Sequence, residues 1–148
     1  MANIIKKYWR KLRYKLRIFM EIRIFKNNEE VHNLPDIFHY WSNKYLLPKH
    51  KPFGFINPED FFEKYCLKIF RKHKTDKNIS FLSVGSGNGN LEVGIAKKLL
   101  AEGFKNFSIE CLDLNKHMLK RTIKLAESQL VSEHIKISQC DFNQWQPE

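Results

Sequence analysis

The stretch FLSVGSGNGNLE, at positions 81–92, decides the fold, because an apolar run there meets a glycine-rich turn and then a helical pattern. Gly85, Gly87 and Gly89 occupy every second position of the turn. Since glycine has no β-carbon, the backbone can adopt positive φ angles and lie close to a ligand at the N-terminus of the following helix. The stretch predicts a sharp strand-to-helix turn that can bind a ligand.

The glycine spacing separates this turn from two common phosphate-binding loops. A P-loop needs Lys followed by Ser or Thr after its last glycine, whereas Asn90 and Leu91 stand there in this chain. The dinucleotide fingerprint places its third glycine one position later, at residue 90. The spacing therefore excludes a P-loop and disfavours a nicotinamide or flavin dinucleotide site.

Strand and helix patterns alternate after residue 78. Apolar runs predict strands over 79–84, 107–112 and 135–140, and helical periodicity predicts helices over 91–101 and 116–129. Short strands joined by helices are typical of a parallel sheet with right-handed crossovers. The predicted fold class is α/β.

An acidic residue follows each of the next two predicted strands. Asp113 precedes Leu114, and Asp141 precedes Phe142. The carboxyl ends of parallel strands meet at the sheet edge where open α/β sheets bind ligands, and a carboxylate such as Asp113 can accept from two ribose hydroxyls. The alternatives are a helix N-cap for Asp113, a role that Asn115 could also fill, and a simple turn residue for Asp141.

Taken together, these residues resemble motif I and the following strand ends of class I S-adenosylmethionine-dependent methyltransferases. The resemblance covers residues 79–148 and implies a Rossmann-like parallel sheet with S-adenosyl-L-methionine as the cofactor. The family often has an acidic residue two positions before the first glycine, where this chain has Ser83. The implied cofactor-binding residues are those of the loop and of the second and third strand ends: Gly85, Ser86, Gly87, Gly89, Asp113, Leu114, Asp141 and Phe142.

The same resemblance sets expectations for the reaction. Members of the family continue through four more strands, so we expect the 148 residues to be a fragment with the first three strands, inactive alone. The expected chemistry is in-line attack of an acceptor nucleophile on the activated methyl group, with orientation and water exclusion supplying most of the acceleration. The acceptor pocket usually follows the fourth strand, so no catalytic residue is assigned.

Two predicted regions precede the cofactor-binding domain, residues 79–148. Residues 1–30 predict a basic amphipathic helix over 3–26, because Ile5, Trp9, Leu12, Leu16 and Phe19 recur at helical spacing. Residues 31–78 predict an aromatic-rich lead-in of short, packed helices, followed by a longer helix that starts after Asn57 and ends at about residue 73.

Basic residues are concentrated in the N-terminal helix. Residues 1–26 contain nine Lys or Arg and one acid, Glu21, which leaves 17 basic and 15 acidic residues elsewhere. The charge is compatible with an anionic membrane surface, a nucleic acid or an acidic protein as the partner of residues 3–26, and of these the nucleic acid is less favoured than the membrane surface. The alternative, ranked slightly higher, is a solvated helix that packs its apolar stripe on the protein's own core.

Cysteine and histidine spacing argues against a disulfide framework or a metal site. Cys66, Cys111 and Cys140 are widely separated, and the six histidines show no ligand spacing. No apolar run approaches the roughly 18 to 20 residues that cross a bilayer. A cytoplasmic location, peripheral at a membrane if the helix binds lipid, is expected.

Two functions follow from these patterns. The first is methyl transfer to a small molecule, lipid or glycan rather than a nucleic acid. The second is a non-catalytic binding or membrane-surface module that acts through the basic helix.

Overall fold

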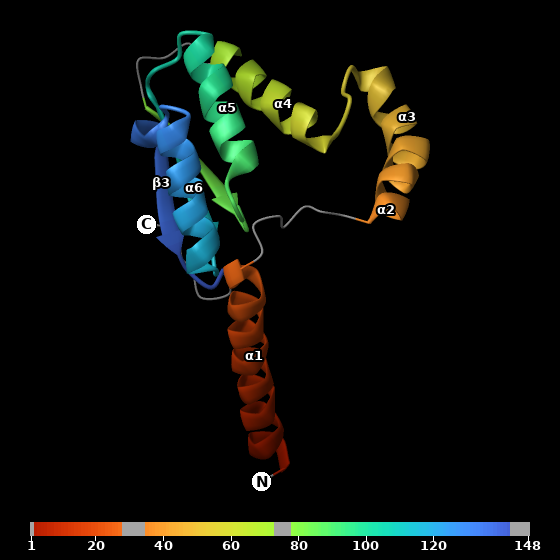
Figure 1. Ribbon diagram of the computed structural model, residues 1–148, viewed down its shortest axis with the longest axis vertical. Coiled ribbons are helices and arrows are strands. Elements are labelled where there is room, and N and C mark those ends of the chain that lie inside the picture. The colour runs from red at the N-terminus through yellow and green to blue at the C-terminus, as the bar shows by residue number, and fades with distance from the viewer. Residues whose placement is uncertain (1, 28–34, 73–77, 143–148) are drawn as a thin grey trace.

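A computed structural model describes residues 2–27, 35–72 and 78–142, and these contain one parallel sheet (Figure 1). Its strands, in spatial order, are β1 (Ile79–Val84), β2 (Phe107–Asp113) and β3 (Ile135–Gln139). Val84 pairs with Leu112, and Asp113 pairs with Gln139. The strands thus end at one edge, and the α/β prediction is confirmed.

Two helices form the crossovers between these strands. α5 (Asn90–Ala101) joins β1 to β2, and α6 (Lys116–Ser128) joins β2 to β3, with a 3-10 turn at Ser132–His134 before β3. Gly103, at φ 86°, follows the end of α5, and Phe104 N donates to Leu99 O at 3.0 Å beyond it. Asn115 Oδ1 accepts from His117 N at 3.0 Å and caps α6.

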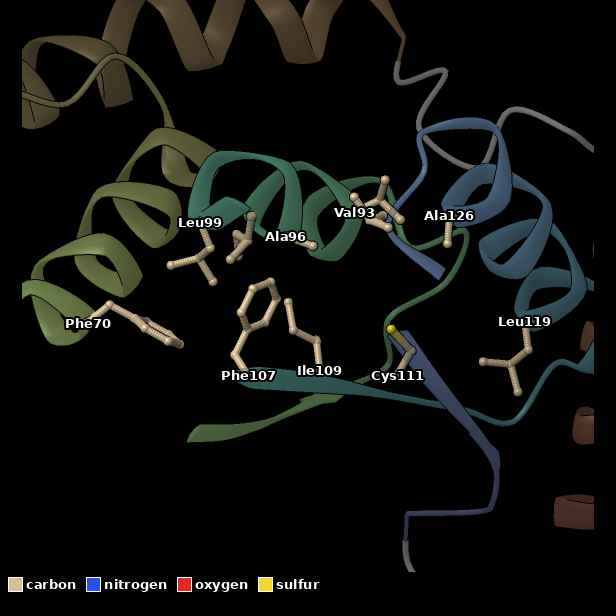
Figure 2. Close-up of a cluster of buried hydrophobic side chains, with 11 residues drawn as sticks. Phe70, Val93, Ala96, Leu99, Phe107, Ile109, Cys111, Leu119 and Ala126 are labelled. Atoms are coloured by element: carbon tan, nitrogen blue, oxygen red, sulfur yellow. The ribbon is translucent and has the colours of Figure 1, made fainter. Parts of the chain in front are cut away.

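The core lies between one face of the sheet and the helices α4 (Pro58–Lys72), α5 and α6. In Figure 2, Val93, Ala96 and Leu99 of α5 face Phe107, Ile109 and Cys111 of β2, while Leu119 and Ala126 come from α6. The three β2 residues alternate along the strand, so they share one face. Phe70 attaches α4 to the same core.

α4 begins as its sequence predicts. Asn57 Oδ1 accepts from Asp60 N at 2.7 Å, and Pro58 occupies the first turn, where no backbone donor is needed. The helix is described as far as Lys72, and its predicted end at about residue 73 lies outside the described residues.

The aromatic-rich lead-in forms short helices, as predicted, but the burial expected from their aromatic residues is not found. Its elements are α2 (Asp36–Trp41), a π-helical turn (Ser42–Leu46), α3 (Leu47–His50) and a 3-10 turn (Lys51–Phe53), and none has a buried residue. Trp41 contacts both Phe38 and Tyr45, with ring centroids 6.2 and 6.1 Å apart. Aromatic density here produces a local cluster because α2 and α3 stand away from the sheet (Figure 1).

The basic helix is α1 (Ala2–Asn27), which projects from the end of α6 (Figure 1). Its predicted stripe of Ile5, Trp9, Leu12, Leu16 and Phe19 remains exposed. Within the described residues the stripe therefore does not pack on the sheet core, contrary to the interpretation ranked higher. No helix within the described ranges is long and apolar enough to cross a bilayer. The expected boundary at residues 30 and 31, the loop at 73–77 and the end at 143–148 lie outside the described residues.

Candidate functional site

The glycine loop turns back over the end of β2. Gly85, Gly87 and Gly89 all have positive φ angles, of 74°, 58° and 72°. Gly85 N and Ser86 N both donate to Leu112 O, at 2.8 and 3.2 Å, and Gly89 N donates to Ser86 O at 3.1 Å. Three left-handed residues separated by single non-glycine residues produce the tight turn that the sequence predicts.

Asp113, at the end of β2, holds this loop in place through a hydrogen bond. Its Oδ2 accepts from Gly87 N at 2.9 Å, and its Oδ1 accepts from Asn115 N at 2.7 Å. Asn115 caps α6, so the N-cap alternative for Asp113 does not apply. Each carboxylate oxygen can accept a further hydrogen bond. Asp113 can therefore hold the loop and still bind a ligand hydroxyl.

The glycines meet different surroundings. A β-carbon on Gly85 would have no atom within 4 Å, whereas one on Gly89 would lie 2.8 Å from Thr122 Oγ1 and 2.9 Å from Thr122 Cβ. Thr122 is fully buried on α6, and its hydroxyl donates to Gly87 O at 3.1 Å. Gly89 is thus required for packing between the loop and α6, and Gly85 leaves open space beside the loop.

The third strand end lies next to the second. Cys140 N donates to Asp113 O at 3.2 Å, and Gln139 Nε2 donates to Leu114 O at 3.3 Å. Asp141 is half-buried, and its Oδ2 accepts from the phenol of Tyr14 in α1 at 2.7 Å. Phe142 is exposed in the turn that follows. All eight predicted site residues therefore occupy the loop or the adjoining strand ends.

Glu92 is a site residue that the sequence interpretation did not assign. It lies in the first turn of α5, is 5 % exposed, and accepts a hydrogen bond on Oε1 from the hydroxyl of Ser83. Its Oε2 has no hydrogen-bond partner within the part of the chain that the structure describes. An acid in a first helical turn usually offsets the helix dipole, so the sequence has no signal that sets Glu92 apart.

A cleft of about 520 Å³ opens beside the loop. It is bounded by β1, by the N-terminal turns of α5 and by α4, with Ser83, Gly85 and Glu92 on the loop side and Phe62 and Cys66 on the α4 side. Its volume falls in the range of about 300 to 1,000 Å³ that is usual for small-molecule sites. The cleft combines an apolar lining with one buried carboxyl group.

Cys111, a buried thiol on β2, is unsuited to nucleophilic chemistry. Burial, with the nearby charge of Glu92 as a second cause, raises its pKa from 9.0 to about 12. The thiol is therefore protonated at neutral pH. Among the described residues there is also no group of His, Cys, Asp and Glu that could hold a metal ion.

The fold and the loop define the kind of sheet that the described residues form. A parallel sheet ordered β1-β2-β3, with a glycine turn after β1, a carboxylate at the end of β2 and another just after β3, is Rossmann-like. Class I methyltransferases, to which the sequence shows a resemblance, have a sheet of this kind.

Comparison with solved structures returned proteins similar to this chain. One is a putative S-adenosylmethionine-dependent methyltransferase from Methanococcus maripaludis, with 24% identity over 72% of this chain and 40% of that one, at a TM-score of 0.42. A second is a methyltransferase from Geobacter sulfurreducens in complex with S-adenosyl-L-homocysteine, with 14% identity over 53% of this chain and 29% of that one, at 0.38. A third is the [4+2]-cyclase SpnF, with 15% identity over 53% and 27%, at 0.40.

The chain spans 40% or less of the length of each of these structures. No protein-family model matched the sequence, and a search of curated proteins found no significant match.

Proposed function

We propose that this chain binds S-adenosyl-L-methionine at the glycine loop and that the protein transfers its methyl group to an acceptor. The observation that carries the proposal is the hydrogen bond between the Asp113 carboxylate and the Gly87 amide, at 2.9 Å. The hydrogen bond holds a carboxylate that can bind ribose hydroxyls against a glycine loop that can bind a ligand. Both lie at the carboxyl edge of a parallel sheet, where such sheets bind ligands. Gly87 and Asp113 are 26 residues apart in sequence, so a local turn does not explain the contact.

The residues beside the loop fit such a cofactor. The open space at Gly85 leaves room for the methionine and ribose part, and the free acceptor positions of Asp113 suit ribose hydroxyls. We assign Glu92 as the residue that accepts from the amino group of the methionine part. The family often has an acidic residue at the position of Ser83, and in this chain Glu92 would take its role. The support is its buried, unpartnered Oε2, since a buried acceptor without a donor is costly and a ligand amino group would satisfy it.

The resemblance to class I methyltransferases implies that Asp141 and Phe142 contact the adenine. A carboxylate can accept from the exocyclic amino group, and an exposed aromatic ring beside it can cover the base. S-adenosyl-L-methionine, when bound, supplies an activated methyl group. The contribution of this chain to the reaction would be to orient that methyl group and keep water from it. We assign no described residue as a catalytic base.

The acceptor is proposed to be a small molecule, lipid or glycan. Outside residues 1–26 the chain has 17 basic and 15 acidic residues, a balance that does not favour a long phosphate backbone as the partner. A nucleic-acid acceptor ranks lower for this reason.

Calorimetry with S-adenosyl-L-homocysteine tests cofactor binding, and the chain offers a matched pair of glycine variants. Gly85→Ala and Gly103→Ala both force alanine to a positive φ, of 74° and 86°, and neither new methyl group meets an atom within 4 Å. Both should lose similar stability, but only Gly85→Ala should weaken binding, because only it projects a methyl group beside the loop. No binding by the unaltered chain, or equal binding by both variants, would contradict the proposal.

Glu92→Gln tests the assigned amino-group contact. The amide keeps the shape of the side chain and can still accept from Ser83, so the fold should retain its stability. Loss of the carboxylate should weaken the binding of S-adenosyl-L-homocysteine by roughly tenfold, since hydrogen bonds to charged groups contribute about 1.5 to 3 kcal/mol. Unchanged affinity would remove Glu92 from the site and leave the rest of the proposal standing.

A further inference from the structure

α1 uses one face to contact the rest of the protein. Tyr14 donates to Asp141, and Ile18, Ile22 and Phe25 are half-buried at the same helical spacing. Near its C-terminal end, the carbonyls of Phe25 and Lys26 accept from Arg121 of α6 at 3.2 and 3.0 Å. Contacts with the body are thus made by a stripe that the sequence interpretation did not single out.

The other side of α1 carries a second apolar stripe, which is exposed. We call it the outer stripe, and its seven side chains are each between 48 and 72 % exposed. A contiguous apolar surface of this kind on a folded protein marks an interaction site rather than ordinary surface. The outer stripe consists of Ile5, Tyr8, Trp9, Leu12, Leu16, Phe19 and Met20.

Positive charges border the outer stripe along both edges. By helical periodicity, Lys6, Arg10, Arg13 and Arg17 follow one edge, while Lys11 and Lys15 follow the other. The helix has a single acid, Glu21. Long basic side chains at the edges of an apolar face can extend to an anionic layer while their aliphatic parts cover apolar surface.

The positive surface continues where α1 meets α6. A hollow of about 550 Å³ there is lined by Lys26, Lys120, Arg121 and Lys124, together with His117. Burial, followed by the surrounding basic side chains, lowers the pKa of His117. The potential around the end of α1 is therefore positive as well.

We propose that α1 is a membrane-surface helix that lies in the headgroup layer of an anionic lipid bilayer, with its outer stripe toward the acyl chains. An apolar face with aromatic residues and basic edges is the composition that binds in this plane, and the charge attracts anionic headgroups. The inner face stays on the protein and holds the strand end at Asp141 close to the lipid. The proposal is independent of whether the chain binds S-adenosyl-L-methionine.

Two other occupants fit the same surface less well. A second copy of α1 packed on the outer stripe would bring two sets of nine cations together, with one acid each to offset them. A nucleic acid would match the charge, but it would leave seven apolar side chains without a suitable surface. An anionic bilayer matches both the charge and the apolar stripe.

Vesicle flotation of the full 148-residue chain tests the proposal. The chain should float with vesicles of phosphatidylcholine and phosphatidylserine at low salt and stay in solution with phosphatidylcholine alone. Leu12→Gln, Leu16→Gln and Phe19→Gln together should reduce the bound fraction by roughly a hundredfold, because three apolar side chains are removed. The matched control is Ile37→Gln, Phe53→Gln and Ile56→Gln, three side chains 65 to 75 % exposed outside α1, which should leave flotation unchanged.

A second variant protects the test against misfolding of the first. Arg10→Gln, Arg13→Gln and Arg17→Gln keep the outer stripe and should also reduce binding by roughly a hundredfold, at about fivefold per charge. Failure of the unaltered chain to float with anionic vesicles would overturn the proposal. A dimer in sedimentation velocity that is lost in the outer-stripe variant would also overturn it. The same holds for RNA binding that competes with the vesicles, since either result would assign the stripe to another partner.

Discussion

At the scale of single residues, the glycines of the loop share a conformation but have different tasks. Gly85 and Gly89 both have φ angles above 70°. Gly89 alone lies against the buried Thr122 side chain, which in turn donates to Gly87 O. One glycine therefore maintains the packing of the loop on α6, and the other leaves space for a ligand.

Gly89→Ala should destabilise the protein by about 2 to 5 kcal/mol, because a left-handed alanine costs about 1 to 2 kcal/mol and the collision with Thr122 adds about 1 to 3. Gly103 is at φ 86°, and a β-carbon there would meet no atom within 4 Å. Gly103→Ala should therefore lose only the stability that the left-handed alanine costs. Urea unfolding of both variants measures the difference. Equal losses would show that Thr122 moves aside without cost.

The raised pKa of Cys111 predicts that the protein loses stability at alkaline pH. Its pKa in the folded protein is about 12, against an ordinary value of 9.0, so the unfolded chain releases this proton first as the pH rises. The free energy of unfolding should therefore be unaffected by this thiol below pH 9 and fall between pH 9 and 12, by up to about 4 kcal/mol.

Urea unfolding across that range, compared with Cys111→Val, isolates the thiol from the lysines and tyrosines that titrate nearby. The variant should lose less stability than the unaltered chain over the same interval. Parallel curves would show that the thiol does not contribute.

At the scale of elements, Phe70 is the buried side chain of α4 and packs the helix on the sheet core, beside the partly buried Cys66 and Leu67. Phe70 is buried against Phe81, Phe104 and Phe107, with ring centroids 5.2 to 5.8 Å apart. The ion pair of Arg71 with Glu102 is exposed and contributes little by comparison. Because α4 also forms one wall of the cleft beside the loop, its position affects the candidate site.

Phe70→Ala should cost about 3 to 5 kcal/mol of stability and loosen α4, since a large buried aromatic side chain is lost. Phe53→Ala removes the same side chain from an exposed position and should change stability by less than about 0.5 kcal/mol. Thermal or urea unfolding distinguishes the two. A small loss for Phe70→Ala would mean that α4 is not held by this cluster.

At the scale of the whole molecule, the hydrogen bond between Tyr14 and Asp141 joins elements 127 residues apart in sequence. It links α1, which we propose lies on a membrane, to a strand end that we propose contacts adenine. A ligand that binds the Asp141 carboxylate would compete with the Tyr14 phenol or share the carboxylate with it.

Tyr14→Phe should therefore change the affinity for S-adenosyl-L-homocysteine, with a gain of roughly fivefold if the two donors compete, because one hydrogen bond is worth about 1 kcal/mol. Calorimetry on this variant provides the measurement. Tyr8→Phe, on the outer stripe, is the control and should have no effect on the affinity. Identical affinities for all three chains would separate α1 from the cofactor site.

Local patterns in the sequence were sufficient for the secondary structure of the sheet region. The predicted range of β1 agrees with the structure, and the predicted ends of β2, β3, α5 and α6 differ from it by one residue. Glycines, caps and apolar periodicity act over a few residues, and they can therefore be recognised without knowledge of the fold. The parallel arrangement followed from the same alternation of strand and helix.

Tertiary structure alone decided which side chains meet. Three contacts depend on how the elements pack, and no residue spacing in the sequence predicts them. They join Glu92 to Ser83, Gly89 to Thr122 and Tyr14 to Asp141. The same holds for α1, where the strongest apolar stripe in the sequence is the one that stays exposed. Periodicity shows that a helix has an apolar face, but only the positions of the other elements determine whether the protein itself covers that face.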